Sequence, residues 1–456
     1  MAANNYPTGL FSSNLKLENE NKFGGKLSIA GCTAEKLVAE FGSPLFVIDQ
    51  DDFYLRIRAW KYALEAEFTD SNLYYAAKSF ISVEIAKWLK DLNVSIDVCT
   101  AGELLVALAA KFPASNIEFH GNNKSESEIQ LAIESKVGVI VLDSFDEINR
   151  VSSIAKSLNK IQKVYLRLTP GVEVHTHEFI STAHEDVKFG FSIASGGAAD
   201  AIDKCMSDGN LELAGIHCHI GSQIFEVEGF IVAAKRLLEV LASFKSKYGK
   251  ELAELNIGGG YGIAYTREER AISPEEVIPT VAKIIKTECQ RLNISIPKIA
   301  IEPGRAIVGP TTTTIYKVGT TKDVTLEDGS IRRYISVDGG MSDNIRPALY
   351  GATYSAFIAN RSSNEIAVKS RVVGKHCESG DILISDLDLP KDLKVGDLLA
   401  IPATGAYSRS MASNYNHVPR PAVVAVQNGS ARLILRRENE QDLLNLDVVQ
   451  APRQLS

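Results

Sequence analysis

The chain has 456 residues, a length that suggests two or three domains. Its composition, 45% hydrophobic and 23% charged residues, is ordinary for a globular protein. Its net charge of -7 argues against nucleic acid or an anionic membrane surface as the main partner, and no stretch approaches the ~18 apolar residues of a membrane helix. The first residues lack a secretion signal and the six cysteines are scattered, so we expect a cytoplasmic protein with reduced thiols and no metal site.

Residues 1–46 contain a strand-like run at 24–31, which we expect to join a β domain formed later in the chain. From residue 47 to about 310, strand-like and helix-like segments alternate. Most of the strand-like runs are continuously apolar, which is typical of a parallel sheet covered on both faces. The predicted strands are 73–79, 95–100, 117–121, 137–144, 163–171, 211–220, 252–260 and 298–304.

Helical stretches are predicted at 83–92 and 103–112, directly after the first two of these strands. Eight strand-and-helix units predict a (β/α)8 barrel, with a doubly wound open sheet as the alternative. The fold class is therefore α/β.

Residues 311–456 change to short strands separated by Gly, Asp and Pro turns. The dipeptide Asn428-Gly429 lies between two apolar runs, and both central positions of a type I′ turn require positive φ. We therefore predict a hairpin here, within an antiparallel β domain of sandwich or barrel form.

Polar residues and glycines gather at the ends of the predicted barrel strands, where such barrels carry their chemistry. They are Lys78, Asp97, His120, Asp143, Arg167, His219, Gly258, Gly259, Gly260, Glu302 and Arg305. A random scatter of polar residues would not favour these positions so strongly.

The glycine run 258–260 follows the seventh strand, and Gly304 and Arg305 follow the eighth. Backbone N–H groups of such a run can cradle a phosphate, and barrels frequently bind phosphate in these two loops. Ser222, after the sixth strand, offers a further donor. The alternative is a tight turn that binds no ligand.

Glu302 and Lys78 suggest which phosphate-containing ligand binds here. A carboxylate at the end of a buried strand needs a partner, and one candidate is a protonated ring nitrogen. Alternatively, Glu302 forms a salt bridge with Arg305 or Arg167. His219 could likewise be a core residue with no role in ligand binding. A lysine in a low-dielectric site is more readily a neutral nucleophile toward an aldehyde. Together these groups describe a site for pyridoxal 5′-phosphate.

The sequence also resembles a known family. It is similar to the fold-type III pyridoxal-phosphate decarboxylases, which share the alanine racemase-like architecture, and among them to the actinobacterial type of the diaminopimelate decarboxylases. The resemblance runs from about residue 42 to residue 437. The motifs that carry it are YYAAKSF, HGNNKS, HTHEFISTAHEDVKFGFS (175–192), HCHIGSQ, IEPGRA, DGGMSDNIRPALYGA, GKHCESGD and GAYSRSMASNYN.

For the cofactor, the resemblance implies that Lys78 holds it covalently and that His219 stacks on the pyridine ring. Ser222 and Gly260 match groups near the phosphate, and Glu302 matches the carboxylate that faces the ring nitrogen.

For the substrate, the resemblance implies that Arg346 and Tyr350 hold a distal carboxylate and that Glu378 reads the distal ammonium group. Arg305 and Tyr407 are expected to contact both cofactor and substrate. The proposed proton donor is matched by Cys377 of a second subunit, which implies a homodimer with shared active sites.

The implied reaction is decarboxylation of meso-diaminopimelate to L-lysine and carbon dioxide, the last step of lysine biosynthesis. Two arginines and an acid suit a substrate with a carboxylate and an ammonium at its far end. The alternatives are an ornithine, arginine or carboxylated-polyamine decarboxylase, a non-catalytic regulator with the same fold, and a related racemase.

Overall fold

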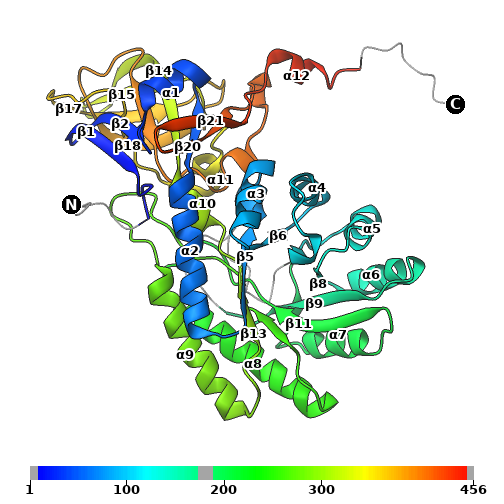
Figure 1. Ribbon diagram of the computed structural model, residues 1–456. Coiled ribbons are helices and arrows are strands. Elements are labelled where there is room, and N and C mark those ends of the chain that lie inside the picture. The colour runs from blue at the N-terminus through cyan, green and yellow to red at the C-terminus, as the bar shows by residue number, and fades with distance from the viewer. Residues whose placement is uncertain (1–8, 173–187, 449–456) are drawn as a thin grey trace.

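The computed structural model describes residues 9–172 and 188–448, which form a parallel barrel and a second, mostly antiparallel sheet (Figure 1). The barrel closes because β8 pairs with β9, so the predicted barrel is confirmed and the open sheet is excluded. A short strand, β10 (Phe191–Ser192), adds to β9 outside the ring. The barrel strands are β5 (Ser71–Ala76), β6 (Ser95–Val98), β7 (Ile117–Phe119), β8 (Val139–Leu142), β9 (Gln162–Thr169), β11 (Leu211–His217), β12 (Glu254–Asn256) and β13 (Lys298–Ile301).

Short connections follow several barrel strands because a capping side chain starts the next helix almost at once. Ser82, Thr100, Ser125 and Ser144 each accept a hydrogen bond from the backbone N–H three residues later, which satisfies a donor at the helix start. Their helices are α3 (Val83–Asp91), α4 (Ala101–Ala109), α5 (Glu126–Glu134) and α6 (Phe145–Ser157). The helices that follow the other barrel strands are α7 (Gly197–Met206), α8 (Glu228–Tyr248), α9 (Pro274–Leu292) and α10 (Arg305–Thr311).

The second sheet lies beyond one end of the barrel (Figure 1). Most of its pairings are antiparallel, whereas β15–β17, β16–β2 and β20–β4 are parallel. Its strands are β1 (Leu15–Asn21), β2 (Gly24–Ile29), β3 (Cys32–Thr33), β4 (Leu45–Asp49), β14 (Thr312–Thr325), β15 (Ile331–Val337), β16 (Phe357–Ile358), β17 (Ala367–Val373), β18 (Ile382–Pro390), β19 (Leu398–Ile401), β20 (Ala422–Gln427) and β21 (Ser430–Leu435).

The predicted hairpin around Asn428-Gly429 is confirmed, since β20 pairs with β21 and both turn residues have positive φ. Short helices accompany the second sheet: α1 (Ala34–Phe41), α11 (Arg346–Tyr350) and α12 (Glu440–Leu444). Single turns of 3-10 helix lie at Ala77–Ser79, Ala114–Asn116, Arg409–Met411 and Tyr415–His417.

The N-terminal segment pairs with strands from the far end of the chain. Strand β2 pairs with β16, and β4 lies between β14 and β20. The expected division at residue 46 therefore falls inside β4, which belongs wholly to the second sheet. Helix α2 (Gln50–Glu67) follows and runs from the second sheet along the barrel (Figure 1). Within the two described ranges, no helix is long and apolar enough to cross a bilayer.

Helix α2 buries one face, which gives a matched pair of leucines for a stability test. Leu64 is 2% exposed and Leu55 is 54% exposed. We expect Leu64→Ala to lower the free energy of unfolding by ~2–5 kcal/mol, because it removes buried methyl groups and leaves a cavity. Leu55→Ala should change it by less than about 1 kcal/mol. Denaturant unfolding of both variants tests this, and equal losses would contradict the packing described for α2.

Candidate active site

One cavity opens at the carboxyl ends of the barrel strands. It collects predicted residues from loops far apart in the chain, because parallel closure brings those ends to a single rim. Its lining residues are Ala76, Lys78, His219, Ser222, Gly260, Tyr261, Glu302, Gly304, Arg305 and Tyr407.

Lys78 lies in the 3-10 turn Ala77–Ser79, directly after β5. Its neighbour across the sheet is Asp97, which pairs with Ala76, and both Asp97 carboxyl oxygens are buried without a hydrogen-bond partner. Burial alone would lower the pKa of Lys78, but the charge of Asp97 and other nearby groups raises it above its ordinary value. Burial also raises the pKa of Asp97, so burial and nearby charges oppose each other at this pair, and a nucleophilic Lys78 amine stays a prediction.

The three successive glycines have different tasks. Only Gly260 lines the cavity. A Cβ on Gly258 would lie 2.2 Å from the carbonyl oxygen of Cys218, and one on Gly259 would lie 2.1 Å from that of Glu302. Gly258 and Gly259 therefore let the loop after β12 pack directly against the backbone of its neighbours.

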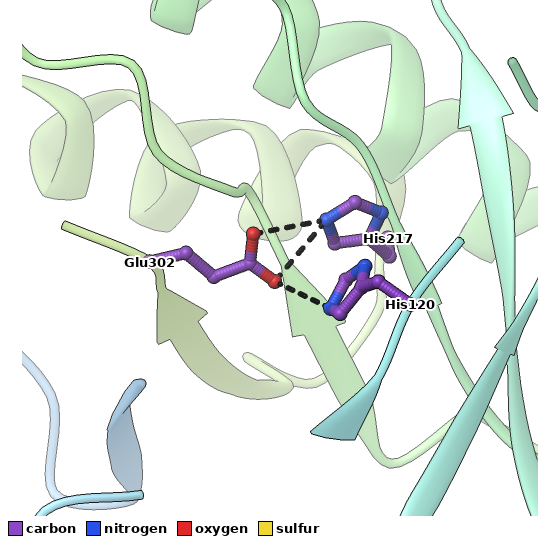
Figure 2. Close-up of side chains that lie close together, drawn as sticks. All are labelled: His120, His217 and Glu302. Atoms are coloured by element: carbon purple, nitrogen blue, oxygen red, sulfur yellow. Dashed lines mark hydrogen bonds and ion pairs between the residues drawn. The ribbon is translucent and has the colours of Figure 1, made fainter. Parts of the chain in front are cut away.

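The Glu302 carboxylate follows β13 immediately, and Figure 2 shows His217, from β11, and His120, directly after β7, beside it. Nε2 of His120 and Nε2 of His217 each lie 3.2 Å from its Oε1, and the Asn256 amide donates a hydrogen bond of 2.8 Å to the same oxygen. Glu302 does not form the alternative salt bridges with Arg167 or Arg305. Arg167 instead lies 3.8 Å from Asp143, and Arg305 donates a hydrogen bond to Ser222.

The charges in this cluster follow from burial and proximity. Burial lowers the pKa of His120 to about 3, and it also lowers the pKa values of His217 and His219. Burial would raise the pKa of Glu302, but its two histidine neighbours hold it well below its usual value. These directions favour a carboxylate at Glu302, which suits a cationic ring nitrogen.

Arg305, the first residue of α10 (Arg305–Thr311), forms the opposite wall. Its Nη2 donates a hydrogen bond of 2.9 Å to Ser222, its Nη1 bonds the Tyr265 hydroxyl, and its guanidinium lies 4.6 Å from the Tyr407 ring centroid. No described carboxylate forms an ion pair with this buried cation, and its Nε has no partner. A buried guanidinium beside Ser222 and Gly260 suits a phosphate.

Arg346 is a second buried guanidinium, 6% exposed, at the start of α11. It bonds the Tyr354 hydroxyl and lies 4.3 Å from the Tyr265 ring centroid. Tyr265 therefore joins Arg346 to Arg305. Tyr350 ends the same short helix, half-buried, and does not line the Lys78 cavity.

Cys377 and Glu378 lie apart from the cavity, exposed on the turn between β17 and β18. The buried Asp381 anchors this turn, because its Oδ1 accepts the Met341 N–H at 2.6 Å and its Oδ2 accepts the His376 N–H at 2.9 Å. The turn thus presents a thiol and a carboxylate outward from this copy of the chain.

Sequence reasoning missed Tyr265, Tyr354, His217 and Asn256. The signal for Tyr265 was its place in the loop after the seventh strand, and the signal for His217 was its place two residues before His219. Most of the motif at 175–192 lies outside the described residues, which resume at residue 188.

The donor set fits pyridoxal 5′-phosphate. Lys78 offers an amine for its aldehyde, Arg305 and Ser222 offer donors for its phosphate, and Glu302 offers an anion for its ring nitrogen. The unpartnered Arg305 Nε is a further unused donor on this wall.

Gly258 gives a test of the packing behind the cavity. Its φ is +72°, and a Cβ would meet the Cys218 carbonyl. We expect Gly258→Ala to weaken binding of pyridoxal 5′-phosphate about tenfold or more, because ~1–3 kcal/mol of strain falls on the cavity loops. Gly209→Ala is the matched control, since a Cβ there meets nothing within 4 Å. Absorbance titration of the apoproteins measures the affinity, and equal values for both variants would contradict the prediction.

Comparisons with known proteins agree on one family. Residues 50–309 match the family described as pyridoxal-dependent decarboxylase, pyridoxal binding domain. A diaminopimelate decarboxylase of Mycobacterium tuberculosis (strain ATCC 25618 / H37Rv) is 49% identical over 428 residues, covering 93% of this chain and 95% of the relative. The relative of that name from Bacillus subtilis (strain 168) is 44% identical over 424 residues, covering 93% and 95%.

The solved structures agree with this. The diaminopimelate decarboxylase of M. jannaschii in complex with L-lysine has a TM-score of 0.89 at 30% identity, covering 97% of this chain and 99% of that chain. This chain therefore belongs to the diaminopimelate decarboxylases, within the pyridoxal-dependent decarboxylases.

Proposed function

We infer that this chain is a pyridoxal 5′-phosphate-dependent carboxy-lyase that converts meso-diaminopimelate to L-lysine and carbon dioxide, the last step of lysine biosynthesis. Membership of the family supports this reaction. The observation that carries the substrate assignment is the pair of buried arginines, Arg305 and Arg346, neither of which forms an ion pair with a described carboxylate.

The bound cofactor supplies an electron-withdrawing ring that stabilises the negative charge left at Cα when carbon dioxide departs. Glu302 assists by keeping a proton on the ring nitrogen, which an anion in a buried site favours strongly. His219, from the loop after β11, is proposed to lie against the ring face. Lys78 would hold the cofactor through Nζ until the substrate amine replaces it, and the released Nζ could then carry a proton.

The two arginines are proposed to divide the anionic groups between them. Arg305 lies beside Ser222 and Gly260, which suits the phosphate, while it also reaches toward the substrate with Tyr407. Arg346, held on the aromatic rings of Tyr265 and Tyr354, is left to bind the distal carboxylate. Ornithine, arginine and polyamine substrates have no carboxylate there and would leave this cation without a partner.

The remaining substrate contacts are proposed to come from a second copy of the chain. Cys377 and Glu378 are exposed on a turn anchored by Asp381 and do not line their own cavity. In a homodimer with shared sites, Glu378 would read the distal ammonium group beside Arg346 and Tyr350. Cys377 would then return a proton to Cα, and Lys78 is the alternative donor. We further propose that the enzyme works in the cytoplasm.

The substrate assignment is tested by supplying purified protein with pyridoxal 5′-phosphate and measuring carbon dioxide release from meso-diaminopimelate, ornithine, arginine and lysine. We expect release from meso-diaminopimelate alone. Lys78→Ala should abolish it, because no amine remains to hold the cofactor and move the proton. Lys156→Ala, on the exposed face of α6, is the control and should retain full activity. Release from ornithine or arginine would overturn the role of Arg346.

The shared site is tested by mixing subunits. We expect Cys377→Ala to slow turnover or divert protonation while cofactor absorbance stays unchanged, because the thiol lies outside the cofactor cavity. Subunits carrying Lys78→Ala and subunits carrying Cys377→Ala should regain activity when they are unfolded together and refolded, since a mixed dimer contains one intact site. No gain above the separate variants, with mixed dimers present, would contradict the shared site.

A further inference from the structure

A second carboxyl group lies close to Glu302 inside the barrel. Glu118, in β7, and Glu302, after β13, are both buried, and the Asn256 amide donates to Oε2 of Glu118 at 2.9 Å and to Oε1 of Glu302 at 2.8 Å. Two carboxylates this close in a dry interior do not both ionise readily, because each charge opposes the other. One of them must hold the negative charge.

The two histidines are arranged around one member of this pair (Figure 2). His217 Nε2 lies 3.2 Å from Oε1 and 3.3 Å from Oε2 of Glu302. His120 Nε2 lies 3.2 Å from Oε1 of Glu302 and farther, at 3.6 Å, from Oε2 of Glu118. Glu302 therefore has two imidazole nitrogens at close range, whereas Glu118 has none at that distance.

Neutral imidazoles fit this arrangement. A neutral His217 with its proton on Nε2 can donate to Glu302 and leaves a bare Nδ1, whereas His120 Nε2 has no hydrogen-bond partner and acts on Glu302 through proximity alone. In His217 that Nδ1 is buried without a partner, which a bare nitrogen tolerates better than an N–H group would. Burial, with the Glu302 charge, raises the pKa of Glu118 well above its usual value, which agrees with a protonated Glu118.

We propose that His120 and His217 are positioning residues that fix the single negative charge of the Glu118–Glu302 pair on Glu302 and aim that carboxylate at the cofactor ring nitrogen. Without them the charge would be shared with Glu118, which belongs to β7 and does not line the cavity. The histidines thus act on the cofactor only through Glu302. This inference rests on the proposed function, because it assumes a pyridoxal ring in the cavity.

The test uses holoenzyme loaded with pyridoxal 5′-phosphate labelled with 15N at the ring nitrogen, whose NMR shift reports whether that nitrogen is protonated. In the natural protein we expect a protonated nitrogen from pH 6 to 9, about the range over which a buried anion can hold it. His217→Leu and His120→Leu should move the shift toward the unprotonated nitrogen. His217→Leu should also lower kcat about 10- to 100-fold with little change in KM, as for loss of a hydrogen bond to a charged group, and His120→Leu should lower kcat less, because only a close polar contact is lost.

Conservative variants keep the test clear of folding defects. Glutamine can place an amide N–H near the former Nε2, so His217→Gln and His120→Gln should restore both the shift and most of kcat. Circular dichroism and thermal unfolding of each variant report the fold. His417→Gln, an exposed histidine, is the matched control and should behave as the natural protein.

Two results would overturn the proposal. One is a ring nitrogen that stays protonated, with unchanged kcat, in both leucine variants. The other is a stoichiometric divalent metal in the holoenzyme that His217→Gln releases, because the cluster would then be a metal site. If the natural protein does not decarboxylate meso-diaminopimelate, the proposed function fails, whereas a histidine-dependent 15N shift would still support the positioning role.

Discussion

A buried carboxylate that must stay charged is the constraint around which this site is built. Glu302 has no bulk water to solvate it, so its partners must come from the protein. They arrive from β12, from the end of β11 and from the residue after β7, each of which reaches the same point only because the barrel is closed. The partners of Glu302 therefore depend on closure of the barrel. Opening the barrel would leave the Glu302 carboxylate without them.

The same logic governs the cations. Lys78 lies near Asp97 of the adjacent strand, which raises the pKa of Lys78, whereas Arg305 and Arg346 rest on aromatic rings and hydroxyl groups. Aromatic faces stabilise a guanidinium without neutralising it. These arginines consequently remain available to anionic groups of the ligands. The charge of a ligand therefore contributes to its selection, in addition to its shape.

Much of the fold could be predicted from the sequence because local signals were strong. Continuous apolar runs identified the barrel strands, and Asn428-Gly429 identified the hairpin. The place of β4 could not be predicted, since its partners β14 and β20 lie hundreds of residues later in the chain. Strand ends revealed Lys78, His219 and Glu302, but their pairing with other side chains could not be predicted: His217 was overlooked beside His219, and Asp97 was not linked to Lys78.

Helix α10 begins at Arg305 and ends at Thr311, and β14 begins at the next residue with no loop between them. Strand β14 then pairs with β4, β15 and β19, at the centre of the second sheet. Tyr407 returns from that sheet to donate its N–H to Ser79, next to Lys78. The barrel and the β domain are consequently not interchangeable modules: a chimera joined near residue 310 would cut the helix that carries Arg305, so the two parts must be inherited and engineered as one unit.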